Sequence, residues 1–246
     1  MTVVSQSAGF VALLAAFAIS GVSLGGRSFA LGLAAGAGGG VGLAAFYRAL
    51  AVGTMSIVSP VVACGAVVPF TISLATGERP STIALAGAVV ALVGAVLASA
   101  EESRAPARGR AQAILLAVVA AGCLGVFTYF LGLGSREGSA LSTLLGARVG
   151  SLALLLVLAF SRRATLRVGR RGLLPVAAVG LADVGANALF AFASGHGLLA
   201  LVSVLGSLYP VTTVLLAHVV LGERLTRFQL AGVGVALAGV AALSVG

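Results

Sequence analysis

The sequence contains no lysine, and only 9% of its 246 residues are charged. A soluble domain needs about 25% charged residues to cover its surface, so this composition excludes an ordinary soluble protein. The absence of lysine also excludes a phosphate-binding loop of the lysine-containing kind, and the sequence has neither H-E-x-x-H nor paired-cysteine metal spacing. We therefore expect no metal site, no cofactor and no enzymatic activity.

Isolated polar or reactive residues give only weak functional candidates. Cys64 and Cys123 lie in apolar stretches, which argues against a disulfide framework and favours a packing role for both. His196, His218 and Arg48 lie near the ends of apolar stretches and have no partner that the sequence reveals.

Long apolar stretches dominate what the sequence does contain. Hydrophobic residues make up 60% of the chain, and the mean hydropathy is +1.17. Because lipid cannot satisfy bare backbone groups, we predict an all-α integral membrane protein, a multi-span helical bundle in the lipid bilayer. About nine stretches approach the roughly 20 residues that a spanning helix needs. The predicted helices cover residues 3–22, 29–51, 55–76, 82–100, 111–133, 139–160, 173–195, 199–221 and 227–245.

The net charge of +9 does not indicate a nucleic-acid partner. The arginines lie mainly in short segments between apolar stretches, where basic residues set membrane orientation. Loops 101–110, 161–172 and 222–227 share one predicted side and carry ten arginines, against three on the other side. The positive-inside rule therefore places these loops and the N-terminus in the cytoplasm, and the C-terminus outside.

One segment of the chain occurs twice. Residues 77–94 and 222–239 are identical at ten of eighteen positions without a gap, and each copy begins Gly-Glu-Arg. Five predicted helices separate the two copies, and because five is odd, the copies have opposite orientations in the membrane. The sequence thus predicts two inverted repeats, 1–100 with four helices and 111–246 with five, joined by a linker at 101–110.

The duplicated motif resembles the EamA-domain exporters of the drug/metabolite transporter superfamily. The resemblance rests on residues that occur in both halves: Pro69, Gly77, Glu78, Arg79, Gly87 and Gly94, and Pro210, Gly222, Glu223, Arg224, Gly232 and Gly239. It implies a plan of two five-helix repeats, from which this sequence lacks the first helix, and a place in the bacterial cytoplasmic membrane. Relatives with ten helices generally keep both termini inside, which opposes the orientation that the arginines predict.

The motif residues have structural interpretations of their own. Glycine can end one helix while the glutamate favours the start of the next helix. Glycines seven residues apart lie near one helix face and let helices approach closely in lipid. Pro69 and Pro210 each remove a backbone donor inside a span, so both predict kinks, which are either tolerated bends or borders of a cavity.

Asp183 is the sharpest candidate for a functional residue. It lies about ten residues from one end of the predicted helix 173–195, roughly 15 Å deep, where a charge usually marks function. Asn187 follows on the same helix face, and Arg148 lies at a similar depth in the preceding helix. These residues form either a polar pocket for substrate or a coupling proton, or a static ion pair. Tyr209, beside Pro210, can offer its hydroxyl to a polar ligand or to a neighbouring carbonyl.

The resemblance and the deep polar residues together predict a secondary transporter that exports small metabolites by alternating access. The alternatives are a non-transporting membrane scaffold or truncated relic, and an intramembrane enzyme. An enzyme would need a catalytic pair, whereas the deep acid of this sequence faces an arginine. The sequence does not name the substrate, the coupling ion or the oligomeric state.

Overall fold

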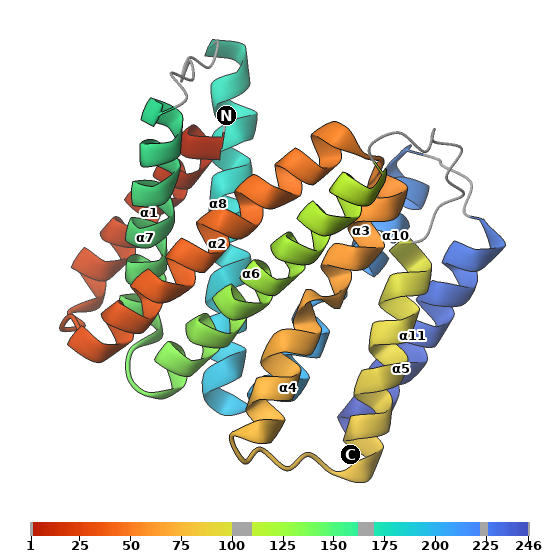
Figure 1. Cartoon of the computed structure of the whole chain (residues 1–246). Coiled ribbons are helices and arrows are strands. Elements are labelled where there is room, and N and C mark those ends of the chain that lie inside the picture. Colours follow the sequence, from red (N-terminus) through yellow and green to blue (C-terminus); the bar gives the residue numbers. More distant parts are fainter. Residues whose placement is uncertain (1, 100–109, 162–169, 222–225, 246) are drawn as a thin grey trace. The chain divides into compact units, whose positions relative to one another are not determined.

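The protein is described by a computed structural model covering residues 2–99, 110–161, 170–221 and 226–245 (Figure 1). These residues form helices joined by short turns. The helices are α1 (Thr2–Ser20), α2 (Gly26–Val52), α3 (Met55–Ala63), the short 3₁₀ turn η1 (Cys64–Ala66), α4 (Val67–Ala75), α5 (Thr82–Ser99), α6 (Arg110–Arg136), α7 (Ala140–Ser161), α8 (Arg170–His196), α9 (Leu199–Gly206), α10 (Tyr209–Leu221) and α11 (Arg227–Val245).

Within the described ranges, nine helical stretches are long and apolar enough to cross a membrane. Their ends agree with the sequence prediction to within a few residues, and the predicted all-α membrane bundle is confirmed. Large apolar side chains such as Ile19, Leu174 and Val219 are exposed, as expected for surfaces that face lipid. The buried core is rich in alanine instead, because small residues let helices pack closely where lipid is as apolar as leucine.

The helices group into two compact units. The first comprises residues 1–41 and 126–197, and the second comprises 42–125 and 198–246. Each unit takes helices from both predicted repeats, and both α2 and α6 continue from one unit into the other. The division into an inverted pair of repeats stays a prediction.

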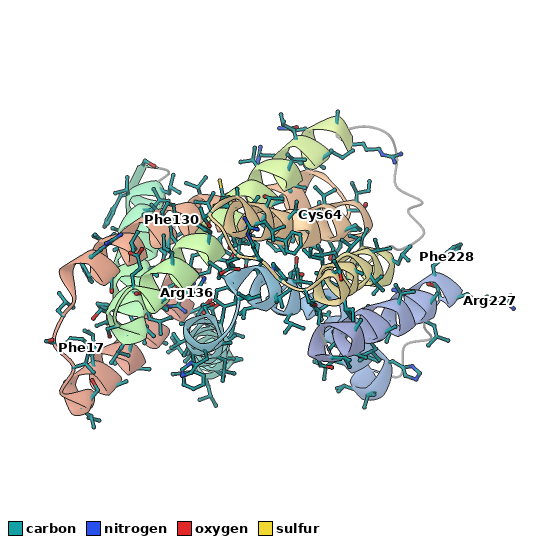
Figure 2. The ribbon with its side chains drawn as sticks, turned by 90° about the horizontal axis from the view of Figure 1, so that it is seen from below. Phe17, Cys64, Phe130, Arg136, Arg227 and Phe228 are labelled. Carbon is teal, nitrogen blue, oxygen red and sulfur yellow. The ribbon has the colours of Figure 1, made fainter. Side chains whose placement is uncertain are left out.

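The first unit packs α1, α7 and α8 with the adjoining parts of α2 and α6. Its core contains Leu13, Leu131 and Leu144, with Phe17 and Phe130 partly buried against them (Figure 2). Glycines bring α2 and α7 together, because a Cβ at Gly32 or Gly36 would collide with the backbone of α7.

In the second unit, α5 and α11 pack closely along their length and lie side by side in Figure 1. The motif glycines form this contact from both sides. A Cβ at Gly94 would collide with the backbone of Ala236, and one at Gly239 would collide with the backbone of Ala91. Gly87 and Gly232 are likewise packed against the opposite backbone. The pair thus depends on the absence of side chains at these positions.

Two spans of the second unit are interrupted near their middle. The span that holds Pro69 breaks at η1, just before the proline, and the span that holds Pro210 breaks between α9 and α10. The physical cause is the same in both spans, because proline lacks the N–H that would bond to the carbonyl four residues earlier. Their expected role at the border of a cavity stays a proposal.

Candidate functional site

Arg148 lies on α7 and is the buried cation at the centre of a polar cluster in the first unit. Its side chain is 6% exposed. One terminal nitrogen donates to Asp183 Oδ2 on α8 at 2.5 Å, and the other donates to Gln6 Oε1 on α1. Three helices therefore converge on one guanidinium.

The packing of glycines explains why these three side chains meet. Gly146 and Gly150 face α2, so Arg148, two residues from each, lies on the opposite face of α7. On α8, Gly180 lies so close to α1 that a Cβ there would collide with the backbone oxygen of Ser5. This close approach brings Gln6 within reach of the arginine that pairs with Asp183.

Asp183 forms the outer part of the cluster. Its side chain is 45% exposed, in contrast to its arginine partner. The Asn187 amide nitrogen donates to the backbone oxygen of Asp183 at 2.9 Å and makes a longer contact of 3.4 Å with Oδ1. The structure thus brings together Arg148, Asp183 and Asn187, as the sequence suggested.

Gln6 is the member of the cluster that sequence reasoning missed. It is a buried amide within the apolar helix α1. Its polarity in that stretch was a usable signal, but its partner lies 142 residues away in the chain.

Electrostatics favours keeping this cluster intact. A lone guanidinium would be very costly inside a membrane, whereas the carboxylate neutralises it and the Gln6 amide satisfies another donor. The buried charge of Arg148 is therefore neutralised and hydrogen-bonded, and the Asp183 carboxylate is the part of the cluster that reaches the protein surface.

Tyr209 belongs to the second unit. It is the first residue of α10, where the interrupted span that holds Pro210 resumes, and it is 46% exposed. It therefore marks the interrupted spans, and its expected part in ligand binding stays a proposal.

The first Gly-Glu-Arg turn has a clear structural role. Gly77 has a φ of 106°, a conformation that favours glycine. The N–H of Glu78 bonds to the carbonyl of Ser73 at 3.0 Å, and the N–H of Gly77 bonds to that of Leu74 at 3.2 Å. These two bonds form a Schellman motif that ends α4.

The Glu78 carboxylate lies at a helix start, but at a different one from that expected. The sequence placed it at the helix that follows the motif, which is α5. Its two oxygens instead accept the N–H groups of Leu199 and Ala200 at the start of α9, each at 2.9 Å. The local argument failed because a turn can present its side chain to a distant helix. The second motif, Gly222, Glu223 and Arg224, lies outside the described residues.

The other polar candidates have local contacts. His196 Nδ1 lies 2.8 Å from the Phe192 carbonyl, and its ring lies beside the Phe192 ring. Cys64 and Cys123 are both free thiols. Among the described residues, His, Cys, Asp and Glu do not gather in threes in a way that could hold a metal ion.

Comparison with known proteins identifies the family. The model of the EamA-like transporter family matches residues 111–245, more than half of the chain. The chain belongs to this family. No curated protein matches it. A solved structure described as "Crystal structure of protein" is similar to the EamA-like chain, with a TM-score of 0.82 and 22% sequence identity, and the match covers 99% of this chain and 86% of the other.

Family membership and the spanning helices together establish the general class of this EamA-like protein. It is an integral membrane protein of the drug/metabolite transporter type, with a lipid bilayer around it and a small molecule as its substrate. EamA-like transporters are generally not enzymes. The matched region contains Arg148, Asp183 and Asn187, whereas Gln6 lies outside it.

Proposed function

We propose that the protein is a secondary transporter that exports small metabolites by alternating access, and that the polar cluster around Arg148 is its binding or coupling site. The observation that carries this proposal is the half-exposed carboxylate of Asp183, paired with a buried arginine near the middle of α8. Charged groups at that depth face a water-filled path or a ligand more readily than lipid, and they usually serve transport.

The exposed carboxylate supplies the chemistry for an exchange. Asp183 can bind a proton from one side of the membrane and a substrate group from the other. A proton or a substrate at Asp183 weakens its bond to Arg148, because both compete for the same negative charge. Through this competition, occupancy of Asp183 changes how α7 packs against α8. Alternating access requires such a link between ligand binding and a change in helix packing.

The interrupted spans of the second unit supply a further part of the proposal. Broken helices in transporters often lie where substrates or ions bind, because the break frees backbone groups. We assign Pro69 and Pro210 to this role, with Tyr209 at the edge of its break. We further assign the protein to the bacterial cytoplasmic membrane.

Transport by reconstituted protein tests the proposal. Purified protein in proteoliposomes should move at least one compound of a radiolabelled metabolite panel, and an imposed proton gradient should accelerate that movement. The variant Asp183→Asn, present at normal levels in the membrane, should abolish it. Glu137→Gln is the matched control, because Glu137 pairs with Arg27 at 2.8 Å, away from the cluster, and should leave transport intact. Undiminished transport by Asp183→Asn, or no transport of any compound, would refute the assignment.

A further inference from the structure

We propose that the polar cluster selects organic cations, with the ammonium group of the substrate bound between Asp183 and Asn187. This inference rests on the proposed transport function and adds the substrate class. It follows from the difference in exposure between the two charged side chains of the cluster: Arg148 is buried, whereas Asp183 is half exposed.

The guanidinium of Arg148, the positive charge of the cluster, already has hydrogen-bond partners. Both terminal nitrogens of Arg148 already donate, one to Gln6 and one to Asp183, and the side chain is 6% exposed. An anionic substrate would have to displace Asp183 and leave that carboxylate without its counter-ion. Such a displacement is unfavourable inside a membrane, so the arginine is a poor anion receptor here.

The negative charge is open to a ligand. Asp183 has 45% of its side chain exposed, and the contact from Asn187 to Oδ1 is long, at 3.4 Å. A carboxylate oxygen has more than one acceptor position, so Oδ1 can receive an N–H donor from a ligand. An ammonium group has three such donors, and charge-assisted bonds of this type are the strong ones.

Asn187 adds a second acceptor. Its amide nitrogen donates to the backbone oxygen of Asp183 at 2.9 Å, which fixes the orientation of the amide group. The amide oxygen is then the free end of the side chain and can accept a second ammonium N–H. A primary ammonium suits this pair better than a quaternary one, because only the primary group can donate.

The surroundings favour an apolar body on the cation. Asp183 is the one charged residue in α8 between Gly172 and Gly195. Val179, one turn earlier on the same face, is largely exposed, whereas Phe190, two turns later, is partly buried against the core of the first unit. A small amine with an aliphatic or aromatic body therefore matches both the charge and the apolar surface.

Chemical protection of Asp183 tests binding in the unaltered protein. Dicyclohexylcarbodiimide modifies carboxyl groups inside membranes, and peptide mass spectrometry locates the product. We expect 2-phenylethylammonium to slow the modification of Asp183, and the matched probes 3-phenylpropanoate and 2-phenylethanol to have no effect. Glu137, which lies in the turn between α6 and α7 and pairs with Arg27, is the control: its modification by a water-soluble carbodiimide should not change with any probe. Protection by 3-phenylpropanoate, or no protection by the amine, would overturn the inference.

Transport separates the failure of this inference from the failure of the proposed function. Compounds that the proteoliposomes move should carry an ammonium group, and Asp183→Glu should retain part of the activity that Asp183→Asn loses. Loss of the charge-assisted bond in Asp183→Asn should weaken binding of 2-phenylethylammonium at least about tenfold. If Asp183→Asn does not fold, the double variant Asp183→Asn with Arg148→Gln removes both charges and serves in its place. Asp183-dependent transport of anions alone would overturn the inference and leave the transporter assignment standing. No transport of any compound would refute both.

Discussion

The carboxylate of Glu78 accepts the backbone N–H of Leu199 at 2.9 Å, although 121 residues separate the two in the chain. Its second oxygen accepts the next N–H, that of Ala200. The first N–H groups of a helix have no partner within the helix, and the helix dipole places partial positive charge there. A motif glutamate of the first half thus stabilises a helix of the second half.

Replacement of this cap should lower stability. Glu78→Gln keeps one oxygen but loses the charge and one of the two bonds, so we expect a loss of about 1–2 kcal/mol. Thermal unfolding of the purified protein in detergent measures the change as a lower midpoint. Arg79→Gln is the control at the adjacent exposed position and should leave the midpoint unchanged. Equal midpoints for Glu78→Gln and the wild type would show that the cap contributes nothing.

The ion pair between Arg148 and Asp183 makes a prediction about stability that is separate from transport. Asp183→Asn leaves a buried guanidinium without its counter-ion. We expect a loss of about 1–3 kcal/mol, below the roughly 3–5 kcal/mol for a fully buried pair, because Asp183 is half exposed. Adding Arg148→Gln should restore much of the loss. A fully stable single variant, or a double variant no better than the single one, would argue against this pairing.

The contact between α5 and α11 can be tested with two glycines. Gly94→Ala places a methyl group against the backbone of Ala236, so we expect overpacking to destabilise the protein by about 1–3 kcal/mol. Gly234→Ala on α11 meets no atom within 4 Å and should be neutral or stabilising by up to about 1 kcal/mol. Thermal unfolding of both variants, prepared in the same way, gives the comparison. Equal effects of the two substitutions would mean that helix propensity, and not close packing, governs Gly94.

Membrane orientation is open to a direct test. The arginine-rich loops predict that the C-terminus lies outside the cytoplasm, whereas ten-helix relatives keep it inside. A C-terminal fusion to a fluorescent protein that folds only in the cytoplasm should therefore be dark. An alkaline phosphatase fusion, active only outside, should be active at the same site. A bright, phosphatase-negative result would favour the orientation of the relatives.

The sequence predicted the helices well because apolar length is a local property. The expected stretches 3–22 and 227–245 correspond closely to α1 and α11, and the others agree similarly. The pairing of Arg148 with Asp183 was also foreseeable, because the two residues lie at similar depths in the membrane on helices that follow each other in the chain. The contacts of Gln6 and Glu78 were not, because both connect helices more than a hundred residues apart. Such contacts depend on which helices pack together, and a single sequence does not reveal that.

The glycine contact between α5 and α11 also has a consequence for biosynthesis. The ribosome makes α11 long after α5, so the glycine face of α5 enters the membrane without its partner. Until α11 arrives, that face exposes a strip of backbone to lipid or to other nascent helices. A chain that stops before residue 227 never covers it. The close packing of the pair therefore cannot form until synthesis has passed residue 227.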